Sequence, residues 1–268
     1  MEKLLLGTRI KTSEEFNGKN SFCEFSSFVR RMHEECGDSA LVYADEKIVI
    51  AAVFDGVSGE SGASKASSVA AASILEFLRN KAPSEKAVRE AISHANKNVI
   101  MGYTTASIFM MNKSGSFVLA CVGDSPIYAM SGEVLDLEIP LGRPVGDNDS
   151  ILKFISHRSL VTSVLGPSGV DIEIRMTKGK LKGGELIILA SDALIDNLYL
   201  KTKEGYITDS SGSEDLKELI KGLKTPVQIT KKLAEEIEKR SRGRKIEKKG
   251  RLLDPKRDDA SIIALRFI

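Results

Sequence analysis

The chain has 268 residues, of which 42% are hydrophobic and 28% are charged, and its formal net charge is +2. These proportions are typical of a globular protein with enough apolar mass for a sizeable core. No segment approaches the ~18 apolar residues that span a bilayer, and the apolar run at 4–6 is too short for a secretory signal. We therefore expect a soluble, cytoplasmic protein without a membrane partner.

The cysteines and the absence of linkers indicate how the chain is organised. Cys23, Cys36 and Cys121 are odd in number and widely spaced, which fits neither a disulfide framework nor a zinc site but suits a reducing cytoplasm. The sequence has no Pro-, Ser- or Gly-rich linker and no internal repeat. We predict one domain over residues 1–268, acting as a monomer and without a nucleic-acid partner.

The first predicted elements are two strands and two helices. Residues 41–44 and 48–54 are β-rich, and 48–54 is apolar throughout, which predicts a strand buried on both faces. Apolar residues recur at helical spacing over 66–78. Ser84 is a candidate N-cap for a second helix that reaches 99.

The chain then returns to strands. Three pairs of β-rich runs follow, each joined through a turn sequence that contains glycine. The pairs are 105–111 with 116–122, 127–130 with 133–137, and 172–176 with 185–191. We interpret the mixed segment 138–160, between the second and third pairs, as a surface excursion.

The C-terminal part predicts helices, a basic run and a last strand. Residues 216–223 have a short amphipathic pattern, and 225–228 is a capping box that opens a helix reaching about 239. Residues 239–257 contain ten Lys or Arg, so they form either a solvated loop or a surface that attracts phosphates or acidic partners. Residues 260–267 alternate as a final strand, and the order of elements indicates an α+β fold.

Acidic residues lie at the ends of several predicted strands. Asp55, Asp124 and Asp192 follow apolar runs, while Asp258 and Asp259 directly precede the last strand. A single aspartate at such a place is more often a turn or cap residue. Carboxylates at the rim of a core are nevertheless costly unless they are paired or bind a cation. Several that converge from different strands indicate a site for a hard cation such as Mg²⁺, Mn²⁺ or Ca²⁺.

Five short motifs at strand ends follow one another along the chain. They are 54–59 (FDGVSG), 104–106 (TTA), 122–125 (VGDS), 189–196 (LASDALID) and 258–261 (DDAS). In this order they resemble the motifs of the PPM family of metal-dependent protein phosphatases, the type 2C serine/threonine phosphatases. Residues 37–38 and 157–166 are similar to two further segments of that family. The resemblance covers residues 35–267 and marks a divergent member.

The resemblance implies both a fold and a set of metal ligands. The expected fold is a four-layer αββα sandwich of two antiparallel sheets flanked by helices, with the metals at one end of the sheets. Asp55 would bridge two Mn²⁺ or Mg²⁺ ions, the Gly56 carbonyl would serve one of them, and Asp192 and Asp258 would complete the pair. Asp38 would hold a metal-bound water.

Further positions match the family in part. Asp124 and Asp196 match the ligands of a third, weaker metal site found in parts of the family, so a third ion is an open expectation. Asp259, where the family often has asparagine, is expected to be structural or close to the site.

The resemblance also implies the reaction. Two metal ions about 3.5–4 Å apart activate a bridging hydroxide, which attacks the phosphorus in line. The implied activity is Mn- or Mg-dependent hydrolysis of phosphoserine and phosphothreonine, with a phosphorylated protein as substrate. The sequence offers no other catalytic set, because it has neither a G-x-S-x-G nor a C-x-x-C motif.

Departures from the family leave alternatives open. His33 stands where the family usually has an arginine that grips the substrate phosphate, and an imidazole offers fewer donors. Arg31 or the basic run 239–257 could supply the missing charge, and His33 stays a catalytic candidate. Gly37 and Val57 also replace residues common in the family. The alternatives are a pseudophosphatase that acts as a binding module, or a phosphatase of small phosphoesters.

Overall fold

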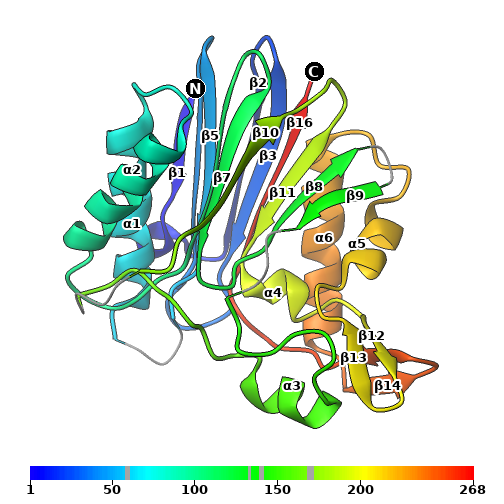
Figure 1. Cartoon of the computed structure of the whole chain (residues 1–268). Helices are drawn as coiled ribbons and strands as arrows, with labels where there is room; N and C mark the ends of the chain where they lie inside the picture. The colour runs from blue at the N-terminus through cyan, green and yellow to red at the C-terminus, as the bar shows by residue number, and fades with distance from the viewer. Residues whose placement is uncertain (58–60, 132–133, 139–141, 168–171) are drawn as a thin grey trace.

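The computed structural model describes residues 1–57, 61–131, 134–138, 142–167 and 172–268. Two six-stranded antiparallel sheets pack face to face, and helices cover the outer side of each sheet (Figure 1). The first sheet has the order β1 (Glu2–Leu5), β4 (Ser39–Ala44), β5 (Ile48–Phe54), β6 (Ala106–Asn112), β7 (Ser116–Val122) and β10 (Arg175–Lys180). The second has the order β2 (Ser13–Lys19), β3 (Cys23–Arg30), β16 (Ala260–Phe267), β11 (Leu186–Ala190), β8 (Ile127–Ser131) and β9 (Val134–Glu138).

Four helices form the two outer layers. Helices α1 (Ala63–Leu78) and α2 (Glu85–Asn98) cover the first sheet, and α5 (Ser213–Ile220) and α6 (Pro226–Ser241) cover the second (Figure 1). Local signals set where two of them begin, because Ser84 caps α2 and Thr225 opens α6 through a capping box. The predicted four-layer αββα sandwich is therefore confirmed.

Strand β5 explains how the layers are held together. Its residues alternate between two cores: Val49, Ala51 and Val53 face the second sheet, while Ile50 and Phe54 face α1 and α2. All seven residues of β5 are buried, which confirms the prediction of a strand without a polar face. The residue that follows the end of this strand therefore lies at the rim of the sandwich, directly beside the apolar core.

A smaller third sheet lies beside the lower end of the sandwich (Figure 1). It has the order β13 (Tyr206–Asp209), β12 (Leu200–Lys203), β15 (Arg251–Leu253) and β14 (Ile246–Lys248). Its strands share a separate core with α3 (Ile151–His157), in which Phe154, Ile207 and Leu252 are buried. The short helix α4 (Asp192–Ile195) leads from β11 toward this region. A 3₁₀ turn at Gly7–Arg9 follows β1.

Three expectations from the sequence need correction. The runs 172–176 and 185–191 do not form a pair, because β10 pairs with β7 in the first sheet and β11 lies in the second. The segment 138–160 contains α3 and buried side chains. Strands β1, β2 and β3 were missed, since their polar residues obscure any apolar alternation. Among the described residues, no helix combines the length and apolar character needed to cross a bilayer.

Candidate metal centre

The motif aspartates gather at one end of the sandwich, near α4. Asp55 follows β5, Asp124 lies just after β7, Asp192 begins α4, and Asp258 lies just before β16. The strands that deliver them belong to both sheets. Asp124, Asp192 and Asp258 are each less than 9% exposed. Their convergence therefore follows from the order of strands, which brings distant parts of the chain to one rim.

The backbone around Asp55 is fixed by the Thr104–Thr105 motif. The Asp55 N–H donates to Thr105 Oγ1 at 3.1 Å, and the Asp55 carbonyl accepts from the Thr105 N–H at 2.8 Å and from Thr104 Oγ1 at 3.0 Å. Gly56 needs to be glycine, because a Cβ there would lie 2.7 Å from the carbonyl oxygens of Ala63 and Gly37. These contacts hold Asp55 and the Gly56 carbonyl at the end of β5.

Serines connect the second sheet to the acidic cluster. The Ser191 N–H donates to the Ser261 carbonyl at 3.0 Å, and the Ser261 N–H donates to Ser191 Oγ at 3.1 Å. Ser261 Oγ donates to Asp38 Oδ2 at 2.7 Å. The Asp192 N–H reaches across to Asp55 Oδ2 at 3.3 Å. The serine of the Ser-Asp motif thus fixes the spacing between the strands that carry Asp192 and Asp258.

Asp259 binds the backbone of the segment that contains His33. Its carboxylate accepts from the backbone N–H groups of Met32 at 2.5 Å, His33 at 3.2 Å and Gly37 at 2.6 Å. The residue is 4% exposed. With three amide donors on its two oxygens, Asp259 orders the approach to the site.

Two cationic side chains lie among the aspartates. Arg143 Nε is 2.9 Å from Asp124 Oδ2 and its Nη1 is 2.8 Å from Asp196 Oδ1, while its Nη2 is 3.6 Å from Asp192 Oδ2. Sequence reasoning missed Arg143, which belongs to none of the motifs. The only unusual feature of the sequence around Arg143 is a glycine and two prolines. They indicate a turn in the backbone but do not show that the guanidinium is buried.

Lys256 is the second cation and comes from the basic run. Its Nζ is 2.9 Å from both Asp192 Oδ2 and Asp258 Oδ2 and 3.7 Å from Asp196 Oδ2. The buried amide of Asn197 donates to the Lys256 carbonyl at 2.9 Å, which holds the backbone at this point. The run 239–257 therefore brings at least one positive charge into the acidic cluster.

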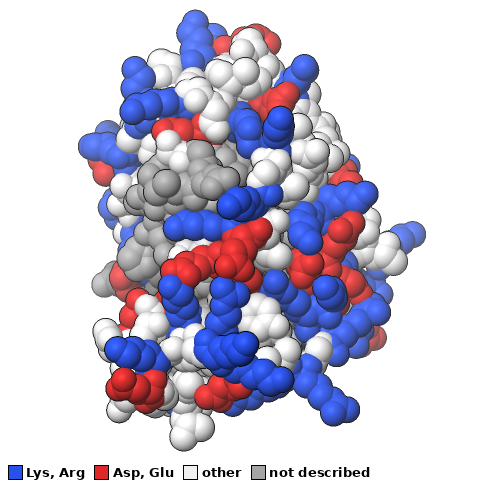
Figure 2. Space-filling model, turned by 90° about the vertical axis from the view of Figure 1, so that its right-hand side faces the viewer, with Lys and Arg blue, Asp and Glu red and all other residues white. Residues whose placement is uncertain are grey.

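The rest of the basic run is divided among several elements. It comprises the end of α6, the hairpin of β14 and β15, and the segment that leads to β16. Figure 2 shows basic and acidic side chains interleaved on the side of the molecule that carries α5 and the small sheet. Arg251 pairs with Glu218 at 3.0 Å, and Arg240 pairs with Asp215. Part of the run is thus engaged in local ion pairs, while residues 243–250 are exposed.

His33 lies at the edge of the same cluster. Its Nε2 is 3.2 Å from Asp258 Oδ1, and its side chain is 49% exposed. Arg31, the alternative phosphate-binding candidate, is exposed. His33 and Lys256 therefore contact opposite oxygens of Asp258, and both can be reached by a ligand from solvent.

The electrostatics differ between the two halves of the cluster. Burial and neighbouring carboxylates, first Asp192 for Asp55 and Asp259 for Asp38, raise the pKa of both residues well above the usual carboxyl value. For Asp192, Lys256 and Arg143 outweigh the effect of burial and lower the pKa. Asp124 lies between these cases: burial outweighs Arg143 and raises its pKa to about 6. The side chains of Asp38 and Asp55 thus lack a compensating positive charge.

The donor set fits divalent cations on one side of the cluster. In the described part of the chain, no three acidic, histidine or cysteine side chains form a ready-made metal site. Lys256 Nζ instead lies between Asp192 and Asp258. Oxygen ligands suit Mg²⁺ or Mn²⁺, and a bound cation would favour the ionised carboxylates of Asp38 and Asp55, whose pKa values are raised without it. Residues Asp55, Asp192 and Asp258 therefore fit a metal centre once Lys256 moves aside.

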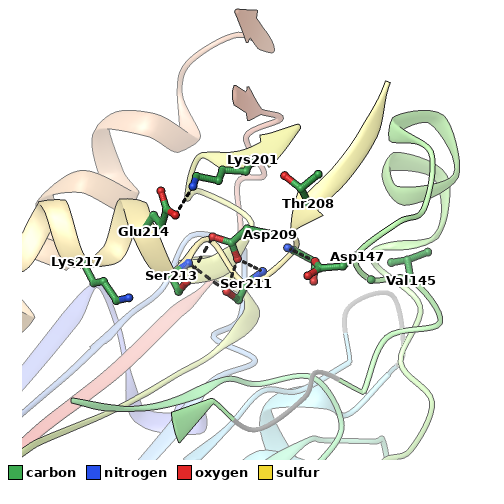
Figure 3. Close-up of a pocket in the computed structure, with 11 residues that line it drawn as sticks. Val145, Asp147, Lys201, Thr208, Asp209, Ser211, Ser213, Glu214 and Lys217 are labelled. Carbon is green, nitrogen blue, oxygen red and sulfur yellow. Dashed lines mark hydrogen bonds and ion pairs between the residues drawn. The ribbon is translucent and has the colours of Figure 1, made fainter. Parts of the chain in front are cut away.

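The cavity shown in Figure 3 is separate from this cluster. It has a volume of about 530 Å³ and lies between the small sheet and α5. Its polar groups bond to one another: Asp147 accepts from the Ser210 N–H at 2.7 Å, and Lys201 pairs with Glu214. No motif aspartate lines it. The cavity and the acidic cluster are therefore two separate features of the structure.

Comparisons with known proteins agree with the fold. No protein-family model matches the chain, and no curated protein matches it by sequence. Solved structures do match. RsbX in complex with magnesium has a TM-score of 0.63 at 15% identity, covering 95% of this chain and 100% of its own. The PPM Ser-Thr phosphatase MsPP from Mycobacterium smegmatis, in complex with cacodylate, has a TM-score of 0.59 at 15% identity, covering 96% and 98%.

A third matching structure contains manganese. The catalytic domain of the serine/threonine protein phosphatase PstP, in complex with two manganese ions, matches with a TM-score of 0.59 at 14% identity, covering 92% of this chain and 99% of its own. The matches extend over nearly the whole length of both chains. The protein has the α+β sandwich fold of the PPM, or type 2C, phosphatases.

Proposed function

We propose that the protein is a Mn²⁺- or Mg²⁺-dependent phosphatase that hydrolyses phosphoserine and phosphothreonine in proteins. The observation that carries this proposal is the gathering of Asp38, Asp55, Asp192 and Asp258 at one rim of the sandwich. Raised pKa values of Asp38 and Asp55, caused by burial and by neighbouring carboxylates, indicate a cluster in need of positive charge.

In this proposal Asp55, the Gly56 carbonyl, Asp192 and Asp258 hold two divalent ions. When bound, the ions neutralise the oxygens of the substrate phosphate and activate water for attack. Asp38, which accepts from Ser261, is positioned to hold or orient a proton near Asp55. His33 and Lys256, both beside Asp258, are the groups that can meet the substrate phosphate in place of the missing arginine.

The choice of substrate rests on the fold comparison. The matched structures include proteins described as serine/threonine phosphatases, which supports a phosphorylated protein as the partner. We place the activity in the cytoplasm because of the cysteines. Cys23, Cys36 and Cys121 are all free and buried, which suits a reducing compartment. Neither a membrane nor a nucleic acid is part of the proposal.

A second candidate is a binding module without catalytic activity. Arg143 and Lys256 already neutralise part of the acidic cluster, and such internal ion pairs would let the fold persist without metal. This reading predicts a folded protein that recognises a partner but does not turn over phosphate.

Turnover distinguishes the candidates. Metal-stripped protein is assayed on a phosphothreonine peptide and on an aryl phosphate, each with Mn²⁺ and with a chelator, beside an Asp192→Ala variant. We expect Mn²⁺-dependent hydrolysis, and we expect the variant to lose about 10³-fold of it because a proposed metal ligand is missing. A loss of this size corresponds to roughly 4 kcal/mol of activation barrier. Preference for the aryl phosphate would favour a small-molecule phosphatase. Folded protein that binds Mn²⁺ without turnover would favour the binding module.

A further inference from the structure

Arg143 is buried in a way that sets it apart from the other cations of the cluster. Its side chain is 0% exposed, and its guanidinium lies within 4 Å of three carboxylates: Asp124 after β7, and Asp192 and Asp196 at the two ends of α4. A guanidinium stays charged throughout the accessible pH range and offers five donors in a fixed plane. Arg143 is thus a permanent positive charge at the bottom of the site.

Gly142, the residue before Arg143, is held by hydrogen bonds at both its N–H and its carbonyl. The Gly142 N–H donates to the Gly123 carbonyl at 3.1 Å, and the Gly142 carbonyl accepts from the Thr162 N–H at 2.8 Å and from Thr162 Oγ1 at 2.9 Å. A Cβ at position 142 would lie 2.4 Å from the Gly123 oxygen. This close approach brings the chain against the residue that precedes Asp124, so the Arg143 side chain starts next to its partners.

Lys256 provides a contrast. Its side chain is 26% exposed, so it can leave the cluster for solvent when a metal binds. Arg143 has no such exit, because its side chain is enclosed and the preceding residue, Gly142, is held by Gly123 and Thr162. Removing one partner of a buried ion pair leaves an uncompensated buried charge, so displacement of the guanidinium is strongly unfavourable. The guanidinium therefore stays where Asp124 and Asp196 meet.

We infer that Arg143 takes the place of a third divalent ion, so that Asp124 and Asp196 bind a guanidinium rather than a metal. The inference rests on the proposed function, because it presumes two metals at Asp55, Asp192 and Asp258. In this arrangement Arg143 is a positioning residue. Its Nη2 lies 3.6 Å from Asp192 Oδ2, so its charge also faces that proposed metal ligand. By occupying Asp124 and Asp196, Arg143 limits the metal content of the protein to two ions.

The test measures how many Mn²⁺ ions the protein binds, by equilibrium dialysis with elemental analysis. Wild-type protein is expected to bind two ions. An Arg143→Met variant frees two buried carboxylates and is expected to bind three, with a larger rise in melting temperature on addition of Mn²⁺. An Asp124→Asn variant, which keeps Arg143, is expected to stay at two.

Arg240→Met is the matched control. Arg240 is also largely buried and pairs with Asp215, outside the acidic cluster, so its loss should lower stability and leave the number of bound ions at two. Three ions in the wild type, two in Arg143→Met, or one in Asp124→Asn would each overturn the inference while leaving the metal-dependent function intact. If Arg143→Met does not fold, the wild-type and Asp124→Asn counts decide. No bound ion in the wild type would instead contradict the proposed function itself.

Discussion

An Asp55→Asn variant is expected to lose metal-dependent hydrolysis by about 10³-fold or more and yet to melt at a higher temperature in the absence of metal. Activity falls because Asp55 is the proposed bridge between two ions, which together supply several kcal/mol of charge stabilisation. The stability of the metal-free fold rises in the variant because Asp55 is surrounded by the carboxylates of Asp192, Asp38 and Asp258. An amide removes that repulsion, and we expect a rise of roughly 2–4 °C, the effect of about 1 kcal/mol in a domain of this size.

The gain in stability should depend on pH. The pKa of Asp55 is raised in the fold by burial and neighbouring charge, so the folded protein retains a proton that the unfolded chain releases. The free energy of unfolding of metal-free wild type therefore falls as pH rises from the ordinary carboxyl range through the raised pKa. Asparagine does not titrate, so the advantage of the variant should grow over the same range.

Asp259→Asn is the control for this prediction. Its carboxylate accepts from three backbone amides, and an asparagine side chain has one oxygen to offer and turns an NH₂ group toward donors. This variant should therefore melt at a lower temperature. Thermal unfolding with a chelator present measures both variants. A lower melting temperature for Asp55→Asn would contradict the view that Asp55 lacks a compensating charge.

A Lys256→Met variant is expected to bind Mn²⁺ at least about tenfold more tightly than wild type. Lys256 Nζ bonds to Asp192 and Asp258, the proposed metal ligands, at 2.9 Å each. An incoming ion has to displace this ammonium, and each charge-assisted hydrogen bond is worth roughly 1.5–3 kcal/mol. Methionine keeps the length of the side chain without competing for the carboxylates. Calorimetric titration of metal-stripped protein measures the affinity.

The matched control for Lys256 is Lys178→Met. Lys178 pairs with Glu85 on the surface, with its side chain 68% exposed, so its loss should leave the affinity for Mn²⁺ unchanged. If Lys256→Met binds Mn²⁺ more weakly, then Lys256 supports the ion instead of competing with it. Turnover by Lys256→Met adds a second readout, because loss of activity together with tighter metal binding would assign the lysine to the substrate phosphate.

The patterns of the sequence predicted an α+β fold because the strongest of them coincide with the central elements, and the family resemblance supplied the four-layer sandwich. Strand β5 is apolar at every position, and α6 begins at a complete capping box, so propensity and tertiary packing agree there. The pairing of 172–176 with 185–191 was wrong because a glycine turn indicates a reversal of the chain without saying which sheet each strand joins. Here β10, which ends at Lys180, is an edge strand of the first sheet, and β11, which begins at Leu186, is an interior strand of the second.

The aspartates of the site could be predicted because each belongs to a motif at the end of an apolar strand. Arg143 could not, because a single arginine in a segment of mixed character gives no periodic signal. Its burial depends on Gly142 approaching Gly123, a contact between the end of β7 and a segment in which the sequence predicted no helix or strand. Lys256 was suggested only through the basic run as a whole. Its contacts depend on how β15 and Asn197 direct the chain toward β16.

The position of bound metal tests the central claim most directly. Crystals of wild-type protein grown with Mn²⁺ would be measured on both sides of the manganese absorption edge, so that anomalous density locates each ion. The account predicts two peaks about 3.5–4 Å apart, on either side of the Asp55 carboxylate, with Lys256 displaced and Arg143 still between Asp124 and Asp196. Lys256 still bridging Asp192 and Asp258, with no peak beside Asp55, would contradict it.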